Sequence, residues 1–189
     1  MTTTLAEGNL TRSLLRSPAE EVPIDADSAL EQLYDEHYVR LVRLATLLLG
    51  NAWQAEEVVQ DSFVAVYERW DRLGGADLPA YLRQTVVNRS RSSLRRLKVA
   101  ERHRPEEPRH EPGADMPAIR GDRRRTVIEA LSRLPRRQRE VLALRYYLDL
   151  SEREIAKTLR ISQGAVKSHA SRGAAALRTQ LSELHQEDA

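Results

Sequence analysis

The segment 151–172 constrains the fold of this chain most, because it predicts two helices joined by a turn with no room for a loop. The Ser151 hydroxyl can cap the first helix, and the Glu154 carboxylate can reach back to the Ser151 amide, which is the pattern of a capping box. Ser162 can cap a second helix, which we expect to run to about Leu181. The segment therefore predicts a helix–turn–helix unit.

Each of these two helices divides into an apolar and a polar face. Ile155, Ala156 and Leu159 share one face of the first helix. Val166 and Ala170 lie one turn apart on the second, so the two apolar faces should pack together. The polar face of the second helix carries residue types that can bind bases or phosphates, namely Gln163, Lys167, Ser168, Ser171 and Arg172. The alternative is an ordinary amphipathic hairpin with a solvated face, which the two caps and the short turn disfavour.

Charge is segregated along the chain, although the formal net charge of its 189 residues is only +2. Segments 83–100 and 123–189 each carry +6, whereas segments 1–27, 28–82 and 101–122 carry −3, −5 and −2. Two basic blocks that alternate with acidic ones indicate two contacts with a polyanion and an acidic face kept for another partner.

Composition excludes several kinds of site. The chain has no cysteine, so disulfides, thiolate zinc sites and thiol catalysis are excluded. Its five histidines show neither metal-ligand spacing nor a catalytic pattern, so we expect no active site, no metal and no cofactor. The longest strongly apolar run, 44–49, is far shorter than the roughly 18 residues of a membrane helix, and no signal-peptide pattern precedes it. We expect a cytoplasmic protein that is not an enzyme.

Three amphipathic helices are predicted in the first half of the chain. Apolar periodicity runs over 29–50 and over 54–70, where we expect Trp70 to be buried in the core. Asp77 can cap a third helix that has Pro79 in its first turn. The apolar stripe of this helix should leave its polar residues largely exposed, and these are Arg83, Asn88, Arg89, Arg91, Arg95 and Arg96. This helix is the first of the two basic blocks.

Domain boundaries follow from a segment with four prolines, mixed charge and no apolar periodicity, which indicates a linker. After it, a helix around 124–134 should restart at Pro135 and lead into the helix–turn–helix unit. The predicted parts are a flexible N-terminal segment (1–27), a first domain (28–100), a linker (101–122), a second domain (123–182) and a tail (183–189). The fold class is therefore all-α, with two small helical domains.

Three stretches of these domains form a recognisable series. They are, in order, YDEHYVRLVRLATLLLGNAWQAEEVVQDSFVAVYERW, AYLRQTVVNRSRSSLRR and, after the linker, LPRRQREVLALRYYLDLSEREIAKTLRISQGAVKSHASRGAAALR. The series closely resembles the extracytoplasmic function (ECF) group of sigma-70 family sigma factors, the promoter-specificity subunits of bacterial RNA polymerase. The resemblance covers roughly 28–100 and 123–181. It implies a sigma domain 2-like bundle of three to four helices and a sigma domain 4-like helix–turn–helix.

The resemblance implies two roles for the first domain. In the family, the helix matching AEEVVQDSF docks on the clamp helices of the largest polymerase subunit, so Glu57, Gln60 and Asp61 are candidates for binding core polymerase. Acidic residues that merely complement a helix dipole are the alternative. The helix matching YLRQTVVNRSRSSLRR corresponds to the reader of the minus 10 element, and its candidates are Arg83, Asn88, Arg89, Arg91 and Arg95. The loop 70–79 matches the place where related proteins trap a flipped base, but its central part, LGGADL, has no aromatic residue, so the capturing residue is open.

For the second domain, the resemblance places the recognition helix in the major groove of the minus 35 element. The matching positions are Lys167, Ser168, Ser171 and Arg172, with Gln163 as a weaker addition. Arg136, Arg137 and Arg139 are candidates for phosphate or for the polymerase flap, and a solvated helix start is an equal alternative.

The implied function is to direct core RNA polymerase to specific promoters and to assist their melting. The implied partners are core polymerase, through its clamp helices and flap, and promoter DNA, with an anti-sigma factor as a further candidate. One alternative is a stand-alone helix–turn–helix regulator whose first domain dimerises. A second is a protein-interaction adaptor that barely binds DNA.

Overall fold

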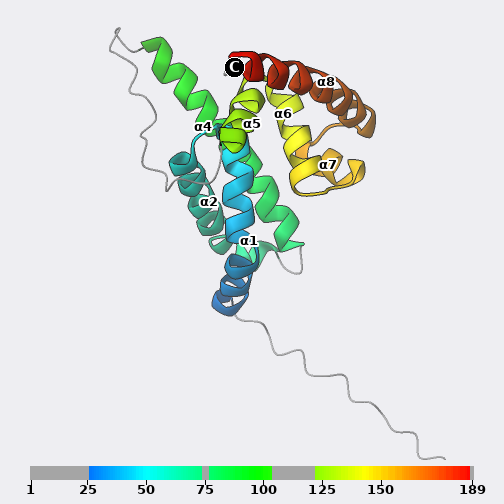
Figure 1. Cartoon of the computed structure of the whole chain (residues 1–189). Coiled ribbons are helices and arrows are strands. Elements are labelled where there is room, and N and C mark those ends of the chain that lie inside the picture. The colour runs from blue at the N-terminus through cyan, green and yellow to red at the C-terminus, as the bar shows by residue number, and fades with distance from the viewer. Residues whose placement is uncertain (1–25, 74–76, 104–121, 188–189) are drawn as a thin grey trace, which may run out of the picture.

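The computed structural model describes residues 26–73, 77–103 and 122–187, in which every element is a helix. In chain order these are α1 (Ala26–Leu49), α2 (Ala52–Tyr67), α3 (Trp70–Leu73), α4 (Leu78–His103), α5 (Asp122–Arg133), α6 (Arg136–Leu142), the π-helix η1 (Ala143–Tyr147), α7 (Glu152–Leu159) and α8 (Gln163–Glu187) (Figure 1). The predicted all-α class is confirmed. None of the described helices is long and apolar enough to cross a membrane.

Several expectations fall on parts of the chain outside the described residues. These parts include nearly all of the expected N-terminal segment and linker, and the middle of the loop 70–79. At the other end of the molecule, α8 continues well beyond the expected Leu181 and includes most of the expected tail.

The first domain is a bundle in which α1, α2 and α4 pack against one another. Leu44 of α1, Val59 and Val66 of α2, and Leu82 and Val86 of α4 are fully buried, because each stripe repeats at three- to four-residue spacing. The chain turns sharply between α1 and α2 at a glycine in the left-handed conformation, where φ is 77°. The next residue, an asparagine, caps α2 by accepting a hydrogen bond from a backbone N–H at 3.0 Å.

The end of α2 differs from the expectation. The helix stops at Tyr67, the chain turns, and Trp70 begins the separate short helix α3, in which no residue is buried. The prediction that Trp70 lies in the core is therefore wrong. Periodicity alone missed this because the turn breaks the register that would have carried the ring inward. The start of α4 agrees with the prediction, since Asp77 accepts a hydrogen bond from the Ala80 N–H at 3.0 Å.

The second domain contains the predicted helix–turn–helix as α7 and α8. The capping box is present: Ser151 donates its N–H to Glu154 at 2.9 Å, and the Ser151 hydroxyl accepts from the Glu154 N–H at 3.3 Å. α7 ends at Leu159 and is followed by Arg160, which adopts the left-handed conformation with φ of 55°. Ser162 caps α8 by accepting from the Ala165 N–H at 3.1 Å. The apolar faces of α7 and α8 are buried against each other, as predicted.

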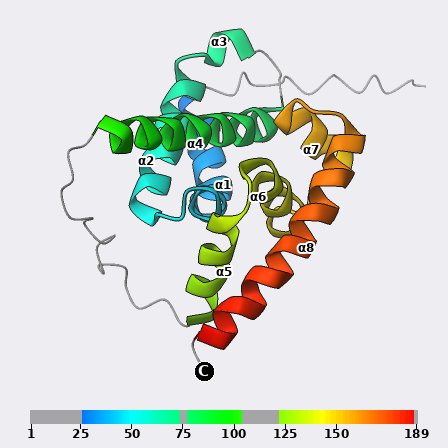
Figure 2. The ribbon, with the colours of Figure 1, turned by 90° about the horizontal axis from the view of Figure 1, so that it is seen from above.

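α8 also lies very close to α6. A Cβ atom at Gly173 would stand 3.1 Å from Gln138 Cβ and 3.2 Å from Leu142, which is tighter than ordinary van der Waals contact. The glycine therefore allows the two helices their short separation. Farther along, α5 covers the C-terminal half of α8, as Figure 2 shows from above.

The two domains pack against each other through α1 and α4 on one side and α5, α6, η1 and α7 on the other. Three arginine side chains cross this junction. Arg40 donates to the Leu148 carbonyl at 3.1 Å, and Arg139 donates to the Leu48 carbonyl at 2.7 Å. The third is Arg91, which belongs to the helix expected to read DNA.

Candidate nucleic-acid interface

The predicted reading face of α8 is open to solvent. All five predicted residues are exposed and share one side of the helix, and these are Gln163, Lys167, Ser168, Ser171 and Arg172. Arg172 is held along the helix, because its Nη2 donates to the Ser168 hydroxyl at 2.8 Å. Lys167 Nζ lies 3.7 Å from a Glu152 carboxylate oxygen, and both groups are solvated. The five side chains therefore form one solvent-exposed polar face along the helix.

An acidic side chain lies at the edge of this face. Glu152 contacts Lys167 from α8 and also accepts a hydrogen bond from Arg145 of η1 at 3.4 Å. Arg145 in turn lies 6.0 Å from the ring of Tyr146, which is exposed. The π-helix thus adds a cation and an aromatic ring beside the recognition helix. Sequence reasoning missed both, because an α-helical register does not predict where η1 places its side chains.

The five predicted DNA-contacting residues of α4 divide between two faces. Asn88 and Arg95 are exposed, and Arg89 is partly exposed on the same side, where it pairs with Asp61 of α2 at 3.1 Å. Arg83 and Arg91 are partly buried toward the second domain, although Arg91 Nη1 also donates to the Asn88 side-chain oxygen at 3.1 Å. The structure therefore brings three of the five together on an open surface.

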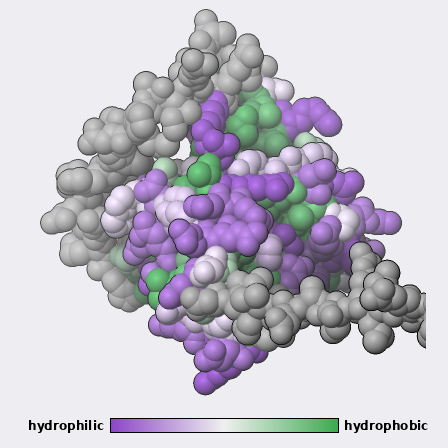
Figure 3. All heavy atoms as spheres, turned by 90° about the horizontal axis from the view of Figure 1, so that it is seen from below, coloured by the Kyte–Doolittle hydropathy of each residue, from purple (hydrophilic) through white to green (hydrophobic). Residues whose placement is uncertain are grey.

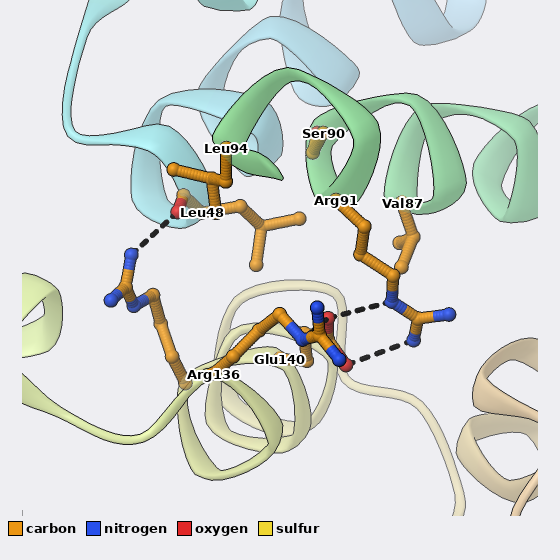
Figure 4. Close-up of a pocket in the computed structure, with 8 residues that line it drawn as sticks. Leu48, Val87, Ser90, Arg91, Leu94, Arg136 and Glu140 are labelled. Atoms are coloured by element: carbon orange, nitrogen blue, oxygen red, sulfur yellow. Dashed lines mark hydrogen bonds and ion pairs between the residues drawn. The ribbon is translucent and has the colours of Figure 1, made fainter. Parts of the chain in front are cut away.

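Arg91 is bound at the domain junction. Its Nε and Nη2 donate to the two carboxylate oxygens of Glu140 at 2.7 and 2.8 Å (Figure 4). The side chains of Arg91 and Glu140 are only 15% and 3% exposed. Arg137 also donates to this carboxylate at 3.0 Å, and Arg136 approaches it within 3.7 Å. The expectation that Arg91 is largely exposed is wrong, because its guanidinium forms an ion pair with the buried carboxylate of Glu140 in α6.

Arg83 and Arg139 are also enclosed by the junction. Burial lowers the pKa of each guanidinium from its ordinary value, and each has a buried Nε with no hydrogen-bond partner. The expected exposure of Arg83 is therefore wrong as well. Arg139 donates to three backbone carbonyls, at Leu48, Ser132 and Leu134, so it serves the packing of α6 in this structure.

A groove of about 300 Å³ runs along the open side of α4. Its lining includes Asn88 and Arg89 together with two residues that sequence reasoning missed, Arg69 and Tyr81. Tyr81 accepts a hydrogen bond from Arg69 at 3.1 Å, which raises the pKa of the Arg69 guanidinium. The groove also touches Arg160 from the turn of the second domain. The spacing of Tyr81 and Asn88, two helical turns apart, is the signal that could have found the aromatic residue.

The outer face of α2 carries the three residues predicted to bind core polymerase. Glu57, Gln60 and Asp61 are all exposed. α2 begins at Ala52 with no acidic residue in its first turn, where a helix dipole acts most strongly, and Asn51 already caps it. The dipole alternative for Glu57 and Asp61 is therefore weakened. Asp61 is paired with Arg89 of α4, whereas Glu57 and Gln60 leave polar side chains on the exposed face of α2.

Family models match both domains of the chain, and known relatives match most of its length. The Sigma-70 region 2 family model matches residues 33–99, and the model of Sigma-70, region 4 matches residues 124–177. The ECF RNA polymerase sigma factor SigL of Mycobacterium tuberculosis is 32% identical over 166 residues, which span 84% of this chain and 93% of SigL. The RNA polymerase sigma-E factor of Streptomyces avermitilis is 32% identical over 157 residues, which span 80% of this chain and 87% of that relative.

Solved structures give the same fold. The sigma factor RpoE of Bartonella quintana, in complex with the anti-sigma factor NepR, matches with a TM-score of 0.63 at 22% identity, over 84% of this chain and 98% of RpoE. CnrH, in complex with the cytosolic domain of CnrY, matches with a TM-score of 0.59 at 25% identity, over 86% of this chain and 91% of CnrH. The chain therefore belongs to the extracytoplasmic function family of sigma-70 RNA polymerase sigma factors.

Proposed function

We propose that this sigma factor brings core RNA polymerase to promoters through three surfaces on three helices. The outer face of α2 binds polymerase, the open side of α4 reads the minus 10 element, and the polar face of α8 reads the minus 35 element. The observation that carries the proposal best is the open face of α8, whose five side chains suit a major groove and are all exposed. The protein acts in the cytoplasm by binding and positioning, without an active site of its own.

At the minus 35 element, Arg172 and Lys167 supply the strongest contacts. Arg172 is already extended along α8 by its bond to Ser168, so its guanidinium loses little freedom when it binds a guanine edge or a phosphate. Lys167 exchanges its exposed contact with Glu152 for a DNA phosphate. Gln163, Ser168 and Ser171 complete the face with groups that can donate to and accept from base edges.

At the minus 10 element, the groove along α4 receives the non-template strand. Asn88 reads a base edge, while Arg89 and Arg95 hold phosphates. Tyr81 offers a ring for stacking beside them, whereas the central loop segment LGGADL contains no aromatic residue. Arg83 and Arg91 remain predicted contacts, and they become available to DNA only when the second domain moves away from α4.

Besides promoter DNA, we propose two protein partners for this chain, namely core RNA polymerase and an anti-sigma factor. Glu57, Gln60 and Asp61 bind basic groups on the clamp helices of core polymerase. Arg136 and Arg137 are proposed contacts of the polymerase flap or of phosphate once they are released from Glu140. An anti-sigma factor is included among the proposed partners, and co-purification of the tagged chain from its source organism would identify it.

Transcription in vitro tests the proposal directly. Purified core RNA polymerase is given fragmented genomic DNA of the source organism, with and without this protein, and RNA 5′ ends are mapped. We expect discrete new start sites that share two spaced upstream elements. Absence of new starts from an active core would overturn the proposal and favour the stand-alone regulator.

A further inference from the structure

The outer face of α2 carries a longer exposed stripe than the predicted acidic residues alone. Its members alternate at spacings of four and three residues, and all are exposed: Trp53, Glu57, Gln60, Val64 and Tyr67. This is the spacing of a seam that packs against another helix. From end to end it extends about 21 Å, at roughly 1.5 Å per residue.

The apolar members of this stripe do not serve the core of the protein. The core side of α2 is supplied by Val58, Val59, Phe63 and Val66, which are buried. Trp53 is instead 73% exposed, the largest fraction among the large exposed hydrophobic residues of the described chain, and Val64 is 56% exposed. On the face shown in Figure 3, apolar residues form separate patches within a mainly hydrophilic surface. A tryptophan that is 73% exposed contributes little to the core, and tryptophan is among the residue types enriched at interface hot spots.

The negative charge of α2 restricts which kind of molecule can bind over this stripe. α2 contains Glu56, Glu57 and Asp61 and neither lysine nor arginine, and Asp61 is paired with Arg89 of α4, so Glu56 and Glu57 contribute most of the negative charge. A second copy of α2 would bring like charges together, and DNA phosphates would be repelled in the same way. The fitting occupant is therefore a helix with an apolar seam and basic residues at its edges.

We propose that Trp53 and Val64 are the apolar anchors through which α2 binds a basic helix of core RNA polymerase. This inference rests on the proposed function, and it assigns to that surface two residues beyond the acidic and amide groups predicted from the sequence. Glu57 and Gln60 lie between the two anchors and set the register, while the anchors supply most of the affinity.

The test compares the affinities of full-length variants for core RNA polymerase, in competition with a fluorescently labelled wild-type chain. The chain offers a matched pair, because Val39 on α1 is 57% exposed and Val64 is 56% exposed. We expect Trp53→Ala to weaken binding about tenfold or more, Val64→Ala about threefold, and Val39→Ala by less than about 1.5-fold. Trp53→Phe should retain most of the affinity, because an aromatic anchor remains. Circular dichroism of each variant checks that the helices are intact.

The outcomes separate this inference from the proposed function. If wild-type chain binds core but Trp53→Ala stays within about twofold of it, or if Val39→Ala and Val64→Ala have equal effects, the anchors are wrong and the proposed function stands. If the wild-type chain itself does not bind an active core polymerase, the proposed function falls and the inference falls with it.

Discussion

The two helices proposed to read DNA differ in how much of their reading surface is free. On α8, all five predicted residues face solvent. On α4, Arg83 and Arg91 face the second domain, and Arg91 is held by both oxygens of Glu140. The difference follows from the positions of the two helices. The N-terminal part of α8 lies at the edge of the molecule, whereas α4 packs against the second domain at the junction (Figure 2). Arginine is thus exposed on the proposed reading face of one helix and enclosed in domain packing on the other.

The largest expected effect comes from removing the buried carboxylate that binds Arg91. Glu140→Ala leaves a buried guanidinium without its counter-ion, so we expect the free energy of unfolding to fall by about 3 kcal/mol, measured by urea denaturation. Glu129→Ala is the control, because it removes an exposed ion pair with Arg133 and should cost less than about 0.5 kcal/mol. Equal effects of the two changes would mean that the junction does not engage Arg91 in solution.

The second effect compares the two reading helices directly. Arg172→Ala should weaken binding of the chain to a duplex with its minus 35 element by about 2 kcal/mol, because a base or phosphate contact is lost. Arg91→Ala should leave this affinity unchanged, since Arg91 is bound at the junction. Fluorescence anisotropy at constant salt measures both. A comparable loss with Arg91→Ala would contradict the division between the two helices.

A smaller effect tests the support of α8. Ser151→Ala removes the hydroxyl that accepts from the Glu154 N–H at the start of α7 and leaves the backbone half of the capping box in place, so the free energy of unfolding should fall by about 1 kcal/mol. Ser182, which is exposed on α8, provides the control, and Ser182→Ala should change stability by less than about 0.5 kcal/mol. A negligible effect of Ser151→Ala would show that packing of α7 against α8, and not the cap, determines where α7 begins.

The smallest effect is a dependence of stability on pH. Hydrogen bonds from Ser151 lower the pKa of Glu154 below its ordinary value. A carboxyl group with a lowered pKa in the folded state stabilises the protein above its unfolded pKa, and this contribution is lost as the pH falls through the folded pKa. The stability difference between wild type and Glu154→Gln should therefore shrink as the solution is acidified below about pH 4. A difference that stays constant in urea titrations across this range would count against the charged cap.

How far the sequence predicted the structure depends on the distance over which each feature is encoded. The capping box at Ser151, the cap at Ser162 and the exposed face of α8 depend on residues within one or two turns, and the structure agrees with these predictions. The pairing of Arg91 with Glu140 joins residues 49 positions apart, and periodicity holds no information about it. The position of Trp70 was predicted wrongly for a different reason. The chain turns after Tyr67, and the sequence there contains no glycine or proline to indicate a turn.

The residues of the candidate site were likewise predictable only where they depend on the local sequence. The minus 35 residues could be proposed from residue type and helical face alone, whereas the groove beside Asn88 needs the packing of α2 on α4 to bring Arg69 to Tyr81. Trp53 was visible in the sequence, but only its exposure separates it from an ordinary core aromatic residue.

The close approach of α6 and α8 at Gly173 has a consequence for the accuracy of promoter recognition. Alanine is a better helix former than glycine by about 1 kcal/mol, yet its methyl group would press on Gln138 and Leu142, so these side chains or α8 itself would have to shift. A tilt pivoting near Gly173 displaces the N-terminal end of the helix, where the side chains proposed to meet bases project. The close packing at Gly173, on the side of α8 opposite the proposed DNA-contacting face, therefore helps to define the orientation of that face.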